Sequence, residues 1–214
     1  MTDWSRVTPP RVRWAAPGDA AAVAARIEAE VRKPGEKRIA FTGGSTPLKV
    51  LALLATRDLD WSGVTIALTD DRCVPDDHPA SNFGKIHAAL GATAARFERL
   101  GQGAPVAPFD LVWLGMGEDG HVASLFPNAP ASVVECETPY VAVRNAGKLP
   151  RQRISLSYAA IAAAAEVWVL VSGPGKEDVF WESFRPGSKT PLARILQLRR
   201  HTRIFTNIAA GQPL

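Results

Sequence analysis

The stretch Arg38-Ile-Ala-Phe-Thr-Gly-Gly-Ser-Thr-Pro47 decides the fold class of this 214-residue chain. A short β-forming apolar run passes through two glycines into a Pro that suits the first turn of a helix. A strand that turns directly into a helix is how a βαβ unit begins. Free N–H groups at the helix start make Gly43, Gly44, Ser45 and Thr46 a candidate anion site. A plain turn with a Ser or Thr cap is the alternative.

The same alternation of strands and helices continues outward along the chain. The predicted strands are residues 38–42, 64–68, 109–114, 140–143, 154–157, 167–171 and 203–205. The predicted helices are residues 19–32, which Asp19 would cap, 47–55, 82–89, 92–100, 159–165, 175–184 and 191–198. This pattern predicts an α/β fold, a Rossmann-like, mostly parallel sheet flanked by helices on both faces. No linker or repeat interrupts it, so we expect a single domain over residues 1–214.

Composition narrows the possible classes of protein. The chain is 46% hydrophobic and 21% charged, without an apolar run of ~18 residues or a signal-like N-terminus, so we expect a cytoplasmic protein without membrane segments. Cys73 and Cys136 are far apart and form no C-x-x-C motif, which argues against a zinc site or a disulfide framework. The net charge of +4 comes without the dense basic stripe of nucleic-acid-binding proteins. This excess is either a solvated surface or attracts a small anion.

A second junction follows the predicted strand 64–68. Thr69, Asp70, Asp71 and Arg72 end a buried-looking strand, where unpaired charge is costly. Open α/β sheets bind ligands at the carboxyl ends of their strands, and the planar guanidinium of Arg72 is suited to an anionic or carbonyl oxygen. A structural pair between Asp70 and Arg72 is the alternative.

The third junction, Leu114-Gly-Met-Gly-Glu-Asp-Gly-His121, contains a G-x-G-x-x-G match. A dinucleotide site would need a long helix after it, but Pro127 leaves room for about two turns, and Glu135 ends no clear second strand. His121 with Asp119 two residues earlier instead provides a base that works near neutral pH and a carboxylate beside it. A structural histidine is the alternative.

Two further cations stand at element starts. Arg153 opens a predicted strand, and Lys176 follows the Ser172-Gly-Pro-Gly175 turn at the start of a predicted helix. Both are candidates to bind phosphate, and a solvated surface position is the alternative for each.

Together these segments resemble the 6-phosphogluconolactonase family, which shares its fold with glucosamine-6-phosphate deaminases and ribose-5-phosphate isomerases. The matching motifs occur in family order. They are Thr42-Gly-Gly-Ser-Thr-Pro47, Thr69-Asp-Asp-Arg-Cys-Val-Pro75 with Ser81-Asn82, Leu114-Gly-Met-Gly-Glu-Asp-Gly-His-Val-Ala-Ser-Leu-Phe-Pro127, Arg153-Ile-Ser-Leu-Ser157 and Ser172-Gly-Pro-Gly-Lys176.

The resemblance implies hydrolysis of 6-phospho-D-glucono-1,5-lactone to 6-phosphogluconate in the pentose phosphate pathway, without a metal or organic cofactor. It implies His121 as general base, Arg72 as a substrate contact, and the loop 43–46 with Arg153 and Lys176 as the phosphate site. Asp119 would orient the imidazole, and the other expected substrate contacts are Asp70, Asn82 and Gly117. The expected partner is the small phosphorylated lactone, bound by a monomer or weak homodimer. Asp71 stands where the family usually has Glu.

The chemistry also fits the residues directly. A lactone carbonyl is electrophilic, so its hydrolysis needs a positioned water, a base and stabilisation of the oxyanion. G-x-S-x-G is absent, which argues against a covalent acyl-enzyme.

Two rival functions stay open. A glucosamine-6-phosphate deaminase or isomerase on the same fold would use carboxylates such as Asp70 and Asp119. A non-catalytic sugar-phosphate sensor usually carries a helix-turn-helix ahead of this fold, whereas only about 35 residues, mostly one helix, precede the first predicted strand.

Overall fold

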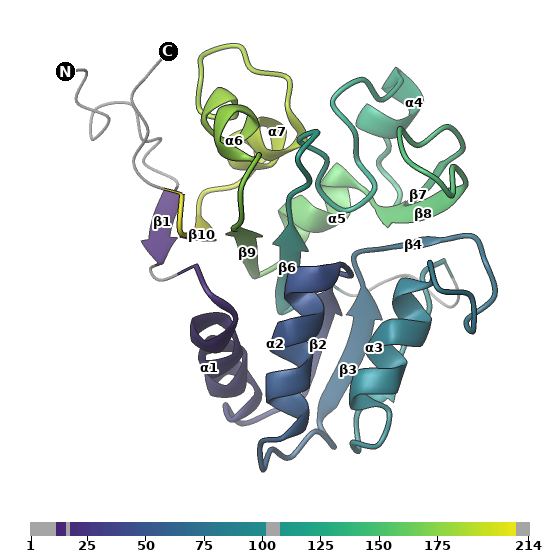
Figure 1. Ribbon diagram of the computed structural model, residues 1–214, viewed down its shortest axis with the longest axis vertical. Coiled ribbons are helices and arrows are strands. Elements are labelled where there is room, and N and C mark those ends of the chain that lie inside the picture. Colours follow the sequence, from purple (N-terminus) through teal and green to yellow (C-terminus); the bar gives the residue numbers. More distant parts are fainter. Residues whose placement is uncertain (1–11, 16–17, 102–107, 209–214) are drawn as a thin grey trace.

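The computed structural model describes residues 12–15, 18–101 and 108–208. Its main sheet has seven strands, all parallel (Figure 1). In spatial order they are β1 (Val12–Ala15), β10 (Thr202–Thr206), β9 (Glu166–Val171), β6 (Leu111–Gly115), β2 (Lys37–Phe41), β3 (Val64–Leu68) and β5 (Arg96–Phe97). β1 lies at one edge and was not predicted.

Helices cover both faces of this sheet. Successive strand side chains point to opposite faces, so Leu111 and Trp113 of β6 join one core cluster while Val112 and Leu114 join the other. The first cluster packs against α1 (Ala20–Val31), α2 (Ser45–Ala55) and α3 (Asn82–Leu90), which lie side by side in Figure 1. The second packs against α5 (Tyr158–Ala163), α6 (Glu177–Glu182) and α7 (Pro191–Leu198). The predicted fold class is confirmed.

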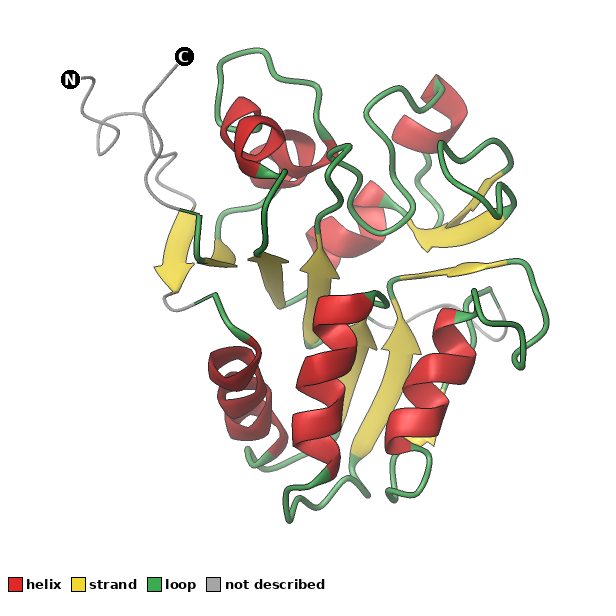
Figure 2. Cartoon of the chain, in the orientation of Figure 1, coloured by secondary structure: helices red, strands yellow, loops and turns green. Residues whose placement is uncertain are grey.

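A second, antiparallel sheet lies beyond the end of β3. It consists of β4 (Asp70–Arg72), β8 (Arg153–Leu156) and β7 (Tyr140–Val143), and α4 (Ala131–Val134) lies beside it (Figure 2). β7 and β8 were predicted as strands, but β4 was not. Thr69 explains the change of partner: its N–H donates to the Phe41 carbonyl at 2.9 Å, and its carbonyl accepts from the Leu156 N–H at 2.7 Å. The chain thus passes from one sheet to the other across a single residue.

The helix predicted over residues 92–100 is wrong. α3 ends at Leu90, and Arg96–Phe97 instead forms the short edge strand β5 along β3. The Phe97 ring packs against Phe83 and His87 of α3, with centroid separations of 6.3 and 4.9 Å. Pairing with β3 and this aromatic contact outweigh the helical propensity of an Ala-rich segment.

The order of the strands places a crevice between β2 and β6. From β2 the chain proceeds outward to β3 and β5, whereas from β6 it proceeds the opposite way, to β9 and β10. Loops that leave neighbouring strands in opposite directions open a space at their carboxyl ends, where open α/β sheets bind ligands.

The N-terminal cap predicted for the first helix is present in the structure. Asp19 caps α1 as predicted, and its carboxylate accepts from the Ala22 N–H at 2.8 Å.

Over the residues that the structure describes, no helix combines the length and the apolar character needed to cross a membrane.

Candidate active site

A pocket of about 370 Å³ occupies the crevice between the ends of β2 and β6. The loops after β2, β6 and β9 form its walls, and the second sheet contributes β4 and β8. The predicted site residues that line it are Gly43, Gly44, Ser45, Thr46, Asp70, Arg72, Asn82, Gly117, His121, Arg153 and Lys176. Asp119 lies behind this wall and lines a neighbouring pocket of about 560 Å³. The four junctions of the sequence therefore meet in one place.

The loop between β2 and α2 has the geometry of an anion site. Gly44 precedes the helix with φ +109°, a conformation that favours glycine, and no side chain caps the helix start. The N–H groups of Ser45 and Thr46 therefore stay available beside the pocket. A Cβ on Gly43 would lie 2.1 Å from Asn82 Oδ1, so only glycine lets this loop approach Asn82.

Asn82 links this loop to β4. Its Nδ2 donates to the Asp70 carbonyl at 3.0 Å, and its Oδ1 accepts from Arg72 Nη1 at 3.2 Å. Arg72 Nη1 also donates to the Ala80 carbonyl at 2.7 Å, which fixes the guanidinium in the pocket wall. Arg72 Nε is buried and has no hydrogen-bond partner among the described residues. A buried donor without a partner is costly, so the hydrogen bonds of Nη1 hold the guanidinium in this orientation at the expense of one at Nε.

The two acidic residues at the start of β4 have different hydrogen-bond partners. Asp70 is only 4% exposed, and its Oδ2 accepts from Ser124 Oγ at 2.6 Å instead of pairing with Arg72. Asp71 accepts from the N–H groups of Asn82 and Phe83 at 2.7 and 3.0 Å. Its carboxylate thereby supports the start of α3.

Asp119 and His121 form a close pair, with Asp119 Oδ1 in contact with His121 Nδ1. The imidazole stacks on the Phe126 ring at a centroid distance of 5.0 Å. Because Nδ1 is engaged, Nε2 is the nitrogen left for a ligand in the pocket. Burial alone would raise the pKa of the Asp119 carboxyl, but the hydrogen bond with His121 and the charges of His121 and Lys148 together lower it.

The segment after β6 does not form a dinucleotide-binding turn. From Met116 to Pro130 it consists of turns and isolated bridges, and only the four-residue helix α4 follows. The helix N-terminus that would hold a pyrophosphate is therefore missing from this segment. Gly117 has another purpose: a Cβ there would lie 2.3 Å from His121 Nδ1 and 2.6 Å from Asp119 Oδ1.

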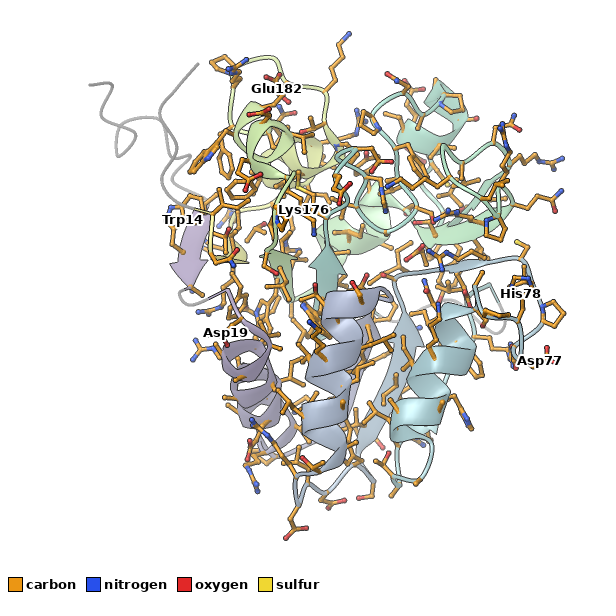
Figure 3. The ribbon with its side chains drawn as sticks, in the orientation of Figure 1. Trp14, Asp19, Asp77, His78, Lys176 and Glu182 are labelled. Carbon is orange, nitrogen blue, oxygen red and sulfur yellow. The ribbon has the colours of Figure 1, made fainter. Side chains whose placement is uncertain are left out.

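Arg153 and Lys176 supply positive charge at the pocket. Arg153 is 3% exposed and donates to the Pro150 carbonyl at 2.9 Å, the Lys148 carbonyl at 3.0 Å and Ser124 Oγ at 3.4 Å. Lys176 lies above the ends of β9 and β6 in Figure 3. Burial lowers the pKa of Lys176, the Glu118 carboxylate partly offsets this, and the Lys148 charge adds to the lowering.

Two charged residues of the pocket were not predicted. Glu118 lies beside the expected residues in the third junction, but its approach to Lys176 depends on the fold. Lys148 comes from the loop between β7 and β8, where nothing in the local sequence distinguishes it from a surface lysine. Within the described ranges, no cluster of three or more His, Cys, Asp or Glu side chains is arranged to hold a metal ion.

Comparison with known proteins places this fold and pocket in a family. The family model for glucosamine-6-phosphate isomerases/6-phosphogluconolactonase matches residues 15–102 and 91–205. The 6-phosphogluconolactonase of Pseudomonas putida is 37% identical over 175 residues, which are 72% of each chain. That of Rhizobium meliloti is 32% identical over 200 residues, 83% of this chain and 86% of the relative.

Solved structures agree with the sequence comparison. A 6-phosphogluconolactonase from Shewanella baltica superposes with a TM-score of 0.79 and 26% identity over 94% of this chain and 97% of that one. A monomeric glucosamine-6-phosphate deaminase superposes with a TM-score of 0.73 at 16% identity, which shows the shared fold alone. The chain belongs to the glucosamine-6-phosphate isomerase/6-phosphogluconolactonase family.

Proposed function

We propose that this chain hydrolyses 6-phospho-D-glucono-1,5-lactone to 6-phosphogluconate, the lactonase step of the oxidative pentose phosphate pathway. The observation that carries the proposal is the Asp119–His121 pair at the edge of a pocket lined by cations. Relatives named 6-phosphogluconolactonase, 32–37% identical over most of the chain, support it. We further propose that the chain acts in the cytoplasm, as a monomer or weak homodimer, and without a cofactor.

In the proposed mechanism, His121 is the general base. Its Nε2 takes a proton from a water molecule, and the hydroxide adds to C1 of the lactone. Asp119 holds the opposite nitrogen and stabilises the imidazolium that forms. Arg72, whose side chain lines the pocket, stabilises the oxyanion on C1. Collapse of the tetrahedral intermediate breaks the bond from C1 to the ring oxygen, and His121 returns the proton to that oxygen.

The phosphate of the substrate would anchor the sugar away from the reacting carbon. The N–H groups of Ser45 and Thr46 and the ammonium of Lys176 are the groups proposed to contact it. Arg153 adds positive charge from the pocket wall. This remote binding energy would hold C1 against the attacking water, because interactions with a non-reacting group can be used to orient the reacting one.

A glucosamine-6-phosphate deaminase is the rival on the same fold. It would need a carboxylate free to remove a proton from C2 of the sugar. Of the two carboxylates that the sequence offers for this role, Asp119 contacts His121, and Asp70 Oδ2 already accepts a short hydrogen bond from Ser124 Oγ, at 2.6 Å. We therefore favour the lactonase.

One assay separates the possibilities. Purified protein is given 6-phosphogluconolactone or glucosamine 6-phosphate, and product formation is followed with the spontaneous lactone hydrolysis subtracted. We expect rapid formation of 6-phosphogluconate and no ammonia release. Ammonia release would favour a deaminase, and binding of both compounds without turnover would favour a sensor.

Substrate selectivity tests the phosphate site. We expect Lys176→Ala to raise KM for the phosphorylated lactone by roughly tenfold or more, because a charge-assisted phosphate contact is lost. KM for unphosphorylated gluconolactone should change little. Lys189→Ala, at an exposed lysine outside the pocket, is the matched control. Equal effects of Lys176→Ala on both lactones would remove Lys176 from the phosphate site.

A further inference from the structure

The loop between β7 and β8 brings a lysine to the catalytic pair. Lys148 Nζ lies 3.6 Å from Asp119 Oδ2, while Asp119 Oδ1 contacts His121 Nδ1. The same lysine lines the pocket, and its side chain is 49% exposed. One carboxylate therefore stands between an imidazole and an ammonium, with one oxygen facing each.

The backbone of this loop is held by a buried cation. Arg153 Nη2 donates to the Lys148 carbonyl at 3.0 Å, and Arg153 Nε donates to the Pro150 carbonyl at 2.9 Å. The Ala146 N–H donates to the Arg151 carbonyl at 3.1 Å across the base of the loop. Arg153 also lies over the Phe126 ring, 5.7 Å from its centroid, and His121 stacks on the same ring. These contacts hold the backbone of residue 148 close to the Asp119–His121 pair.

We propose that Lys148 is a positioning residue that holds Asp119 against His121 and opposes protonation of the imidazole. The inference rests on the proposed function, because it assigns Lys148 a task in the use of His121 as a base. A lone carboxylate beside a histidine favours the imidazolium, which cannot accept a proton from water. An ammonium on the second carboxylate oxygen offsets part of that charge but leaves the first oxygen as a hydrogen-bond acceptor.

Several other charged side chains line the same pocket as Lys148. The other titratable and charged groups that line the pocket come from the loops after β6 and β9 and from β4 and β8. They are Glu118, Lys176, Asp70, Arg72 and Arg153. Among them and Lys148, the ammonium of Lys148 is the cation that contacts Asp119 directly. Its removal should therefore change the titration of His121 more than removal of a distant charge.

The first test is an NMR titration, which needs no substrate. The chain has four histidines, and the Cε1–H resonance of His121 is assigned by its loss in His121→Gln. In Lys148→Met the midpoint of this resonance should move to higher pH by roughly 0.5–1 unit. Lys148→Arg should restore the wild-type midpoint. Arg151→Met, at an exposed cation of the same loop, should leave the midpoint in place.

The second test uses kinetics on 6-phosphogluconolactone between about pH 5 and 8, with thermal melting to confirm folding. The acid limb of kcat/KM should move to higher pH in Lys148→Met, and kcat near neutral pH should fall roughly 5- to 50-fold. KM should stay within about threefold, because the ground-state contacts to substrate are kept. Lys148→Arg should recover most of kcat.

The outcomes discriminate between roles. An unmoved His121 midpoint in Lys148→Met would overturn the inference, as would Lys148→Arg behaving like Lys148→Met. A loss confined to KM for the phosphorylated lactone would instead make Lys148 a phosphate ligand. If the wild type does not hydrolyse the lactone, the proposed function fails, and the NMR titration still decides the part about Asp119 and His121.

Discussion

At the residue scale, Gly117 limits the space around the Asp119–His121 pair. A Cβ at this position would lie 2.3 Å from two atoms of the His121 ring and 2.6 Å from Asp119 Oδ1. The backbone N–H of Gly117 also donates to the His121 carbonyl at 2.9 Å, which closes the turn that carries the pair. The orientation of the imidazole therefore depends on the absence of a side chain at residue 117.

We expect Gly117→Ala to displace His121 and Asp119 and to lower kcat/KM for lactone hydrolysis by about 10²-fold, because small misplacements of a base are costly. Thermal melting should change little, because the colliding atoms are side-chain ends that can move. Gly63→Ala is the matched control, since the nearest atom to its Cβ would be 3.7 Å away and Gly63 precedes β3, at the opposite end of that strand from the pocket. Wild-type kcat/KM in Gly117→Ala would contradict the assigned geometry.

At the scale of elements, the start of α3 depends on a side chain from β4. Both carboxylate oxygens of Asp71 accept from helix N–H groups, those of Asn82 and Phe83, and Ser81 caps the helix by accepting from the Gly84 N–H at 2.9 Å. Because Asn82 also orients Arg72, the same contacts that begin the helix shape the pocket.

Removal of this carboxylate should destabilise the protein. We expect Asp71→Ala to lower the free energy of unfolding by about 1–2 kcal/mol, the usual cost of losing a helix cap. Urea denaturation of the purified variant measures it. Asp77→Ala is the control, because Asp77 is exposed at the edge of the molecule in Figure 3, on the loop between β4 and α3. A loss no larger than that of Asp77→Ala would show that Asp71 contributes nothing to the helix start.

The sequence predicted those elements whose local pattern and tertiary environment agree. Residues 191–198 form α7 with the predicted bounds, because Thr190 caps it, Pro191 opens it, and its apolar residues face the core. The segment 92–100 has helical composition, but the free edge of β3 pairs with it as a strand. Pairing partners of this kind depend on the whole fold, so no window of the sequence reveals them.

The same distinction applies to the site. His121, Arg72 and Lys176 were predictable because each follows a strand whose carboxyl end meets the others at one edge. Lys148 was not, because its position depends on two carbonyl contacts of Arg153, which is separated from the third junction by about 30 residues.

At the scale of the whole molecule, the strand order explains why four cationic side chains lie around one pocket. Cationic side chains from β4, β8, the β7–β8 loop and the start of α6 line the crevice between β2 and β6. They are Arg72, Arg153, Lys148 and Lys176. The net charge of +4 alone does not distinguish a solvated surface from a binding site, but the clustering of these four around one pocket favours a small anionic substrate.

The measurement that tests this account most directly is the rate of 6-phosphogluconate formation from 6-phosphogluconolactone by His121→Gln, with spontaneous hydrolysis subtracted. Loss of the general base should lower kcat by roughly 10²- to 10⁴-fold relative to the wild type while the protein stays folded. His78→Gln, at an exposed histidine on the loop between β4 and α3, should keep the wild-type rate (Figure 3). A rate for His121→Gln within about threefold of the wild type would contradict the assignment of His121 as the base.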